Sequence, residues 1–404
     1  MIFKLAFRNI IRQKRRSILT IATIVGGFAF GSMAIGMRMG SFNMIIDMFT
    51  RAYLGHIQLH ADGYLDQPTL YKVIEDYEGI GGELASLDFV EAWAPRLYAA
   101  GLVSVDDKSD AASIIGVDPE LEESATTFSA KIETGNNFSD DQSNEVILGK
   151  GLMEALGAGI GDELVLVVQA ADGSMGNDLY RIIGSIDVGN EGTNRMAVYM
   201  RLDDAQELMV MPDRAHEIVV IIDNIKKLGK YSGAIKSKLA GKGIEVSTWD
   251  EINVNLAEMI ESKEQAQAVM QFVIMLIVAV GVLNTVLMSV LERTREFGIL
   301  KALGTRPISI FRLIITESTM MSLLGIIGGA IVGSAVNFAL SRGGIVYPEP
   351  YEIGGILVDT MKSEVNLRTI FEPAIAVFFT ALIVSIFPAL RAAKTEPAKS
   401  MRFH

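Results

Sequence analysis

The sequence has no cysteine among its 404 residues, and it has few histidines, 4 in all. Without cysteine the chain can form neither disulfide bonds nor thiolate metal sites, and it has no thiol nucleophile. The cellular compartment stays undecided on this ground, because a bacterial outer face can be free of disulfides. Any chemistry would have to come from other side chains.

Signatures of nucleotide-binding and hydrolytic sites are missing as well. No G-x-x-x-x-G-K-[ST] phosphate loop occurs, since the nearest fragment, residues 148–157, lacks Ser or Thr after Lys150. No G-x-S-x-G nucleophile elbow occurs either. The chain is therefore not expected to bind ATP through such a loop or to carry a serine hydrolase site of this type.

The remaining candidate ligands are weak. His56 and His60 lie on one face of an expected strand, but the glutamate of an H-E-x-x-H zinc motif is absent. Two acidic pairs lie in expected loops and are expected to be solvated: Glu122 with Glu123, and Asp140 with Asp141. We expect no catalytic residue, no metal site and no cofactor in this chain.

Long uncharged runs are the dominant feature of the sequence. About 20 apolar residues span the roughly 30 Å hydrocarbon core of a bilayer as a helix. Three uncharged runs reach this length and a fourth is slightly shorter: residues 17–37, 265–291, 318–341 and 373–390. The sequence therefore predicts four transmembrane helices, at residues 17–40, 268–291, 313–341 and 373–390.

The first uncharged run could instead be a secretory signal peptide, because a basic segment precedes it. Its length exceeds that of a normal signal-peptide apolar region, and no clear A-x-A cleavage site follows. We expect the run to be a membrane anchor.

Positive charge is concentrated at three places beside the predicted spans. Residues 1–16, 292–312 and 391–404 together hold 15 of the 36 Lys and Arg residues but 3 of the 48 Asp and Glu residues. Because Lys and Arg flank the cytoplasmic ends of spans, both termini and the 292–312 loop are predicted to be cytoplasmic. Residues 41–267 and the 342–372 loop then face outward. The net charge of −12 combines a basic inner rim with an acidic outer domain, and it does not indicate nucleic-acid binding.

Residues 1–16 have the pattern of an amphipathic helix. Phe3, Phe7 and Ile10 recur at helical spacing, whereas Lys4 and Arg8 lie on another face. Such a helix is typical of a segment that lies on the inner leaflet and attracts anionic lipid. A basic tail that only aids solubility is the alternative.

Residues 41–267 predict a folded α+β domain inserted between the first two spans. Alternating apolar residues and turn signals predict strands at 55–61, 90–105, 163–171, 179–188, 195–200, 217–223 and 243–249. Helical patterns occur at residues 149–157, 202–209 and 225–240. We predict two α+β subdomains, one inserted into the other at about residues 126–212.

A helical stripe leads from this domain into the second span. Ile252, Leu256, Met259 and Ile260 recur at helical spacing without proline or glycine. An unbroken helix over residues 250–291 would be about 60 Å long at 1.5 Å per residue, and only half of that fits in the bilayer. The rest is predicted to form a stalk.

The most specific segment is residues 284–318, NTVLMSVLERTREFGILKALGTRPISIFRLIITES. It resembles the permease family that includes the macrolide exporter MacB, the lipoprotein-releasing permeases and the division protein FtsX. In that family a run E-R-T-R-E-x-G-x-x-[KR]-A-[LV]-G links the second and third spans. The residues that match it here are Glu292, Arg293, Thr294, Arg295, Glu296, Gly298, Lys301, Ala302, Leu303 and Gly304.

The resemblance implies that residues 292–306 form the coupling helix that an ATPase subunit receives. A short helix with Phe297 and Leu300 on one side and charges on the other could lodge in a groove of the partner. A plain amphipathic linker is the alternative.

Two residues of the predicted spans are candidates for contacts inside the membrane. Asn284 and Glu317 belong to the resembling segment, and Glu317 matches a glutamate common in the third span of the family. An ionised residue in a span is costly unless it is paired or reaches the interface. Glu317 either contacts partner helices or takes part in gating, or it snorkels or pairs with Arg293 or Arg312.

Two further segments are similar to the same family. Residues 388–403 resemble its P-x-x-x-A-A-x-x-x-P-x-x-x-[LM]-R ending, and residues 147–166 resemble the start of the inserted subdomain in its outer domain. The fused ATPase of the macrolide exporter is absent here, so a separate chain is expected to supply it. The 342–372 loop is nearer in length to that of the lipoprotein-releasing permeases, and FtsX has a much smaller outer domain.

The resemblance implies a multi-pass permease subunit in the bacterial inner membrane. It would work by mechanotransmission on a lipoprotein or another amphiphile, and alternatives are an FtsX-like activator of a periplasmic hydrolase and a MacB-like efflux permease. Expected partners are an ABC ATPase that binds ATP and Mg, a second permease copy or paralogue, a periplasmic lipoprotein or adaptor, and membrane lipids.

Overall fold

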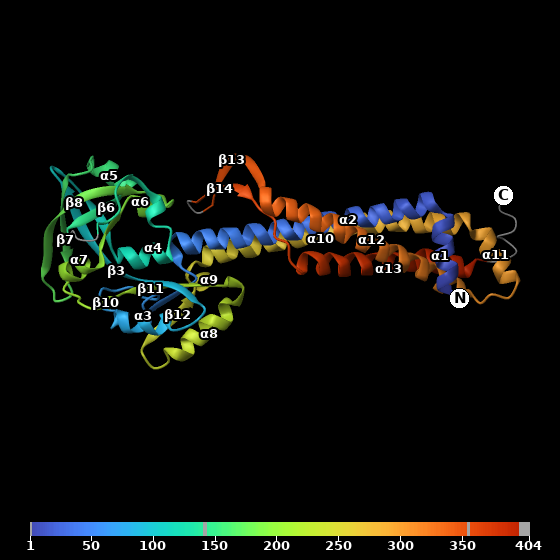
Figure 1. Ribbon diagram of the computed structural model, residues 1–404, viewed down its shortest axis with the longest axis horizontal. Helices are drawn as coiled ribbons and strands as arrows, with labels where there is room; N and C mark the ends of the chain where they lie inside the picture. The colour runs from blue at the N-terminus through green and yellow to red at the C-terminus, as the bar shows by residue number, and fades with distance from the viewer. Residues whose placement is uncertain (1, 140–143, 354–355, 396–404) are drawn as a thin grey trace. The chain divides into compact units, whose positions relative to one another are not determined.

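The computed structural model describes residues 2–139, 144–353 and 356–395 of the chain (Figure 1). The chain divides into two compact units. The helical unit comprises Met1–Met44, Met259–Pro348 and Asp359–His404, and the sheet unit comprises Ile45–Glu258 and Glu349–Val358. The end of the tail, residues 396–404, and the acidic pair Asp140 with Asp141 lie outside the described residues.

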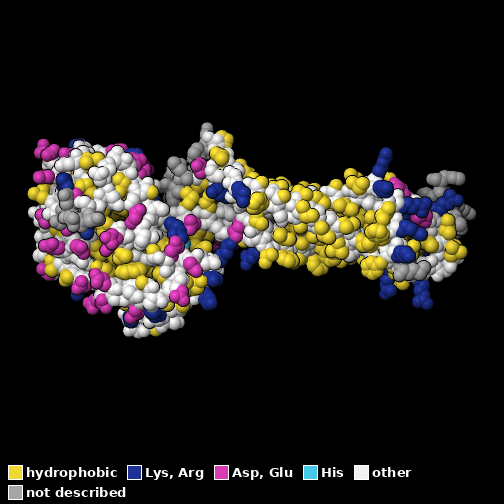
Figure 2. Space-filling view, viewed as in Figure 1, with side chains coloured by type: hydrophobic (Ala, Val, Ile, Leu, Met, Phe, Trp, Pro, Cys, Tyr) yellow, Lys and Arg dark blue, Asp and Glu magenta, His cyan; other side chains and the backbone are white. Residues whose placement is uncertain are grey.

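Four helices are long and apolar enough to cross a membrane, as the sequence predicts. They are α2 (Lys14–Phe49), α10 (Val254–Glu292), α12 (Pro307–Gly343) and α13 (Arg368–Lys394). Each of the four uncharged runs lies inside one of them. Figure 2 shows hydrophobic side chains covering the visible surface of this bundle, with Lys and Arg gathered at the end that carries the N-terminus.

Glycines of α12 bring its backbone close to α2. A Cβ atom at Gly329 would lie 2.6 Å from the Cβ of Phe28, and one at Gly333 would lie 3.0 Å from the Cβ of Ser32. Gly325 meets Ile24 in the same way, one turn away. Small residues at every fourth position allow this approach, which favours dispersion contacts between helices where the lipid offers no hydrophobic driving force.

A buried polar cluster ties the other end of α12 to its neighbours. The amide nitrogen of Asn337 donates to the carbonyl and hydroxyl oxygens of Ser32, each at 3.1 Å, and its amide oxygen accepts from Ser363 at 3.0 Å. The hydroxyl of Ser32 donates to the carbonyl of Thr369 at 2.7 Å. These bonds join α2, α12 and the start of α13 in an apolar setting.

Replacing Asn337 with leucine is expected to destabilise the helical unit by about 1–2 kcal/mol, because the partners of its amide lose their bonds between helices. Equilibrium unfolding of the purified chain in mixed detergent micelles measures this effect. Ser341→Ala is the control, at a half-buried serine whose hydroxyl donates only to the Phe338 carbonyl of the same helix, and it should change stability by less than about 0.5 kcal/mol.

The N-terminal segment forms α1 (Ile2–Arg12), which packs against α12. Ala6 and Ile10 are buried, whereas Phe3 and Phe7 are exposed. The expected amphipathic helix is present, but Ile10 faces the protein and the two phenylalanines remain available to lipid.

The sheet unit is built on a ten-stranded sheet. Its strands are β1 (Ile57–Ala61), β3 (Val90–Val105), β4 (Lys108–Val117), β5 (Ile132–Gly135), β6 (Glu145–Gly149), β7 (Glu163–Gln169), β8 (Met175–Ile186), β9 (Ala197–Arg201), β11 (Glu217–Ile222) and β12 (Ile244–Thr248). The strand order is β12-β1-β11-β3-β4-β9-β6-β8-β5, and β7 pairs with both β3 and β8. The pairings of β3, β4, β9, β6, β8 and β7 therefore form a closed circuit, which leaves no open edge among these six strands.

Short helices accompany this sheet. They are α3 (Tyr77–Ala85), α4 (Pro119–Ala125), α5 (Lys150–Leu156), α6 (Glu191–Asn194), α7 (Leu202–Leu208), α8 (Leu228–Lys238) and α9 (Trp249–Ile252). Small antiparallel pairs are β2 (Ile74–Glu75) with β10 (Arg214–Ala215), and β13 (Ile345–Ile353) with β14 (Ile356–Met361). The strands and helices predicted by periodicity are confirmed within a few residues.

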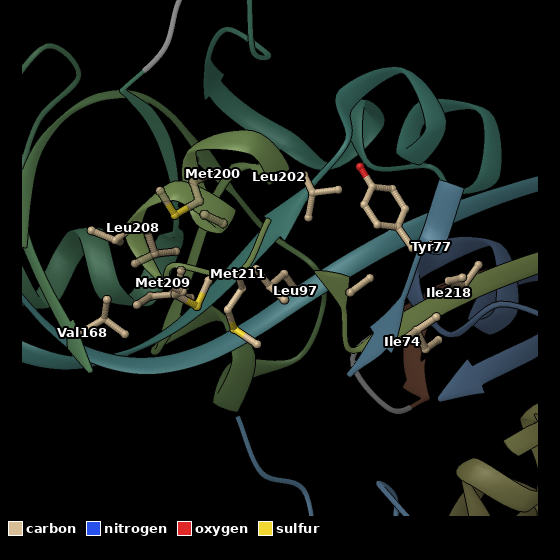
Figure 3. Close-up of a cluster of buried hydrophobic side chains, with 14 of the residues drawn as sticks. Ile74, Tyr77, Leu97, Val168, Met200, Leu202, Leu208, Met209, Met211 and Ile218 are labelled. Atoms are coloured by element: carbon tan, nitrogen blue, oxygen red, sulfur yellow. The ribbon is translucent and has the colours of Figure 1, made fainter. Parts of the chain in front are cut away.

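The core of the sheet unit lies between the inward faces of the strands and the helices α3, α5 and α7. Leu97, Leu202 and Met209 are fully or almost fully buried in it and are drawn in Figure 3. Alternating residues of β7 point inward, which follows from the two-residue period of a strand. The burial of this cluster provides the main stabilisation of the unit.

The predicted insertion of a separate subdomain at about residues 126–212 is not confirmed. Strands β5 to β9 come from that segment, but the closed circuit also needs β3 and β4, which precede it. The whole segment Ile45–Glu258 clusters as one unit. The division into two subdomains stays a prediction.

The predicted unbroken helix over residues 250–291 is wrong at its start. A short helix, α9, ends at Ile252, and α10 begins at Val254. Asn253 lies between them outside helical geometry, at φ −106° and ψ 74°. Its side-chain oxygen accepts a hydrogen bond from the Leu256 amide at 3.1 Å, so Asn253 caps the long helix and interrupts the stripe.

Candidate functional site

The segment that matches the family run contains a short helix between α10 and α12. This helix is α11 (Thr294–Ala302). Gly304 ends it with φ +91°, a left-handed conformation that glycine adopts without strain. The amide of Thr305 donates to the carbonyl of Leu300, and that of Gly304 to the carbonyl of Lys301. The helix is thus an element separate from α12, and a glycine turn follows it.

A buried ion pair fixes the start of this helix. One guanidinium nitrogen of Arg293 donates to both carboxylate oxygens of Glu317, at 3.1 and 2.9 Å. Both side chains are buried in the helical unit. Of the two partners that the sequence leaves open for Glu317, the structure therefore selects Arg293, and Arg312 is exposed.

The same carboxylate connects to the N-terminal helix. The side-chain amide of Asn9 in α1 donates to Glu317 at 2.6 Å. Arg293 also bonds Glu296 at 3.2 Å, and its guanidinium carbon lies 5.0 Å from the centre of the Phe297 ring. One buried pair therefore joins α1, α11 and α12.

Lys301 joins α11 to the last helix. Its amino group donates to the carbonyls of Ala393 and Thr395, each at 2.7 Å. These carbonyls belong to the end of α13, where a helix presents unpaired acceptors and partial negative charge. Lys301 thus caps α13 and ties α11 to the end of that helix.

The outward side of α11 is partly apolar. Ile299 and Leu300 are exposed, and Leu303, just after the helix, is 79% exposed. Glu296 and Arg295 are exposed as well. An exposed apolar strip with charges beside it is a typical contact surface for a partner protein.

Phe297 does not belong to this strip. Its side chain is fully buried among residues of α10, α12 and α13. The expectation that Phe297 and Leu300 share the docking side is therefore wrong for Phe297, because helical spacing alone does not say which face is covered by the bundle. Gly298 is buried beside it.

The other predicted residues occupy varied places. Glu292 forms an ion pair with Arg16 of α2, and the Thr294 hydroxyl donates to the carbonyl of Leu291 at 2.8 Å. Ala302 and Asn284 are exposed on α11 and α10. The structure thus brings together Arg293, Glu296 and Glu317, and it does not bring Asn284 into that cluster.

The two histidines that the sequence singles out, His56 and His60, are buried in the sheet unit. His56 is buried, and its ring accepts a hydrogen bond from the Ile222 amide at 3.0 Å. Burial, aided by the charge of Arg51, lowers the pKa of His56 to about 4, so the ring is neutral at pH 7. His60 lies 3.4 Å from Glu217. Among the described residues no three His, Asp or Glu side chains are placed to hold a metal ion.

The expectation that Glu122 is solvated is wrong. Its carboxylate is buried and accepts two bonds from Arg96, at 3.0 and 2.6 Å. Arg96 also donates to Glu217 at 2.9 Å and to the carbonyl of Tyr53 at 2.8 Å. Tyr53 belongs to the π-helical turn Thr50–Leu54, which follows α2, so this charge cluster fastens that turn to β3, β11 and α4.

Sequence reasoning missed Asn9, Arg96 and Glu217. Arg96 and Glu217 had a detectable signal, because each is a charged residue in a strand segment that is mostly apolar. Asn9 had no such signal, because an asparagine is an ordinary residue in a basic amphipathic helix. Its role depends on the position of α12.

Comparisons with known proteins agree with the predicted family. The model described as MacB-like periplasmic core domain matches residues 17–238, and the model described as FtsX-like permease C-terminal matches residues 268–397. The first of these covers more than half of the chain.

Three relatives illustrate the similarity. The lipoprotein-releasing system transmembrane protein LolC of Xylella fastidiosa is 24% identical over 330 residues, which are 77% of this chain and 77% of that protein. LolC of Neisseria meningitidis is 20% identical over 99% of this chain and 98% of its own length. The macrolide export ATP-binding/permease protein MacB of Psychrobacter arcticus is 22% identical over 99% of this chain and 59% of its own length. With its four apolar helices, the chain is a multi-pass membrane protein that belongs to the family of ABC transporter permeases of the LolC, MacB and FtsX type.

Proposed function

We propose that this permease couples ATP hydrolysis by a separate ATPase subunit to work on a lipoprotein or another amphiphile at the far side of the membrane. The observation that carries the proposal is the construction of α11. A short helix with an exposed apolar strip is joined by the Arg293–Glu317 pair and by Lys301 to three other helices. Helix α11 is therefore suited to be displaced by the ATPase and to transmit that displacement to the helices bonded to it.

The proposed orientation places both termini and α11 in the cytoplasm and the sheet unit in the periplasm. Lys and Arg are concentrated in the first 16 residues, the segment around α11 and the tail, which is the pattern of cytoplasmic flanks. The ATPase, with its ATP and Mg, would then meet α11 from the cytoplasmic side. The bacterial inner membrane is the proposed location.

The proposed mechanism is mechanotransmission through the helices. Closure of the ATPase on nucleotide would push α11, and α10, α12 and α13 would move because α11 is bonded to or continuous with them. The segments at 41–53 and 250–268 would change the posture of the sheet unit. By linkage, a cargo that prefers one posture must change nucleotide affinity by the same free energy.

The names of the relatives support two cargo classes. LolC is named for lipoprotein release and covers nearly this whole chain, which favours lipoprotein as the cargo. MacB is named for macrolide export, so an efflux permease is the alternative. An FtsX-like activator of a periplasmic hydrolase is a further alternative, supported by the match of residues 268–397.

The proposed complex contains two permease chains, identical or paralogous, and two ATPase subunits. Exposed apolar residues of α10, such as Phe272 and Ile277, would face lipid or the second permease chain. A periplasmic lipoprotein or adaptor would meet the sheet unit. Native mass spectrometry of the complex purified from its membrane identifies these partners.

Replacing Leu303 with aspartate is expected to weaken binding of the ATPase at least about tenfold, because a charge would replace the most exposed apolar side chain of the strip. Glu296→Ala and Gly298→Ala are expected to leave assembly intact and to reduce the stimulation of ATP hydrolysis by cargo. Co-purification and ATPase assays in lipid nanodiscs measure the two effects.

Leu367→Asp is the matched control for Leu303→Asp. Leu367 is 71% exposed and precedes α13, at the end of that helix opposite to Lys301. Its replacement should leave ATPase binding unchanged. Equal binding of the ATPase by wild type and Leu303→Asp, with unchanged coupling in Glu296→Ala and Gly298→Ala, would refute the assignment of α11.

A further inference from the structure

Two adjoining cavities lie beside the π-helical turn in the sheet unit. They have volumes of about 200 and about 660 Å³, and both are lined by Ala52, Lys131 and Val188. The larger cavity also carries the carboxylates of Asp47, Glu133 and Asp187, which would repel an anion. The smaller one has no Asp or Glu in its lining.

Lys131 supplies the charge of the smaller cavity. Its amino group donates one hydrogen bond, at 3.3 Å, to the carbonyl of Val188. No carboxylate in the described part of the chain lies within 4.0 Å of it as an ion-pair partner. Burial, aided by the positive charge of Arg96, lowers the pKa of Lys131 to about 8. Asp187 of the larger cavity attracts this charge from a distance, but within the described residues Lys131 has no direct ion-pair partner.

Two side-chain amides add donors to the lining of the smaller cavity. The oxygen of Asn190 accepts from the Thr193 amide at 3.0 Å, and that of Asn253 accepts from the Leu256 amide at 3.1 Å. The oxygens are thereby engaged, and neither NH₂ group donates to a residue that the structure describes. Together with Lys131, the cavity offers a set of N–H donors, which is what an anionic oxygen accepts from.

Three apolar and aromatic residues also line the smaller cavity. They are Phe49, Tyr53 and Leu54, from the end of α2 and the turn that follows. A volume of about 200 Å³ is below the roughly 300–1,000 Å³ of sites for drug-sized ligands, so it fits a small head group and a short length of chain.

We propose that this cavity binds an amphiphile through one anionic group, a phosphate ester or a carboxylate, held by Lys131, Asn190 and Asn253, with its apolar chain against Phe49, Tyr53 and Leu54. The larger cavity, which carries three carboxylates, does not take this group. The proposal is independent of the role of α11. The bound anion favours the charged form of Lys131 and therefore raises its pKa.

Acetylation of lysines tests the site in the full chain with its ATPase, in nanodiscs of phosphatidylcholine. Octyl phosphate below its micellar concentration is expected to slow acetylation of Lys131 about tenfold, read by peptide mass spectrometry. The pH at which Lys131 becomes reactive toward acetylation should also shift to a higher value. Lys230, an exposed lysine of α8, is the internal reference and should react at an unchanged rate. Octanol, which lacks the anion, and inorganic phosphate, which lacks the chain, should give no protection at the same concentration.

Two variants separate recognition from folding. Asn253→Asp keeps an oxygen to cap α10 but removes the NH₂ donor and adds a negative charge, so binding of radiolabelled octyl phosphate should fall at least about tenfold. Lys131→Met should abolish it, and Lys230→Met should leave it unchanged. Unprotected Lys131, undiminished binding by Asn253→Asp, or equal protection by inorganic phosphate would each overturn the proposal. None of these results would affect the expected loss of ATPase binding in Leu303→Asp.

Discussion

Replacing Glu317 with leucine is expected to destabilise the helical unit by about 3–5 kcal/mol, because Arg293 would stay buried without its counter-charge. The Asn9 amide would lose its acceptor at the same time. The effect is read from equilibrium unfolding in mixed micelles. We also expect cargo stimulation of ATP hydrolysis to be lost, since the start of α11 would no longer be fixed.

Three further variants control this prediction. Arg293→Met with Glu317→Leu removes both charges and should recover most of the stability, because apolar side chains of similar size can replace a buried pair. Asn9→Ala removes one neutral donor and should cost about 1 kcal/mol. Glu292→Ala breaks the partly exposed pair with Arg16 and should cost less than about 1 kcal/mol. A Glu317→Leu chain as stable as Glu292→Ala would contradict the importance of the buried pair.

Replacing Arg96 with methionine is expected to destabilise the sheet unit by about 3–5 kcal/mol, because Glu122 and Glu217 would both remain buried without a cation. The carbonyl of Tyr53 would lose a donor, so the π-helical turn would be released from β3. Denaturant unfolding and hydrogen exchange of the turn measure the two consequences. Arg96→Lys keeps the charge but not the planar set of donors. The stability of this variant should lie between that of Arg96→Met and that of wild type.

The effect of Arg96 should depend on pH through Glu217. Burial alone would raise the pKa of Glu217, but the hydrogen bond from His60 and the charge of Arg96 hold that pKa below its ordinary value. A depressed folded pKa contributes stability that is present above the unfolded value, about 4.3, and is lost as pH falls through the folded value. In Arg96→Met the opposing charge is gone, so the pKa of Glu217 should rise and less stability should be lost on acidification. The stability difference between wild type and Arg96→Met should therefore narrow as pH falls below about 4.3.

Lys242→Met is the matched control for Arg96→Met. Lys242 pairs with Glu83, and both side chains are 39% exposed. Such a pair contributes about 0–1 kcal/mol, so its loss should be small at every pH. A similar loss of stability in Arg96→Met and Lys242→Met would show that the buried cluster does not anchor the turn.

Periodicity predicted most elements of the sheet unit, because local alternation reports which residues face the core. The segment at 90–105 is a strand with the predicted bounds, and α7 begins at Leu202 as the acidic first turn indicates. Periodicity could not predict the closed circuit of strands. The pairing of β3 with β7 joins residues more than 60 positions apart, and nothing local encodes that register.

The buried charges also differ in how far the sequence could predict their partners. A glutamate at position 317 of an apolar span is costly without a partner, and the sequence offered Arg293 and Arg312 as partners beside snorkelling, gating and contact with partner helices. Nothing in the sequence indicated that Glu122 is buried, because this residue lies in a short acidic helix. Its partner Arg96 comes close only through the packing of α4 on β3. The break between α9 and α10 at Asn253 could not be predicted from the sequence either, since asparagine is compatible with both a helix interior and a cap.

The sequence alone determined that the chain has four apolar helices, where its basic flanks lie, and to which permease family it belongs, because length without charge and a long motif are local properties. The tertiary structure alone decided that Arg293 pairs with Glu317, that Phe297 is buried, that Arg96 fastens the turn after α2, and that Lys131 borders a cavity whose lining has no Asp or Glu. These features depend on contacts between side chains that are distant in the sequence. Burial makes such contacts energetically important, because a charge removed from water is costly unless it is paired.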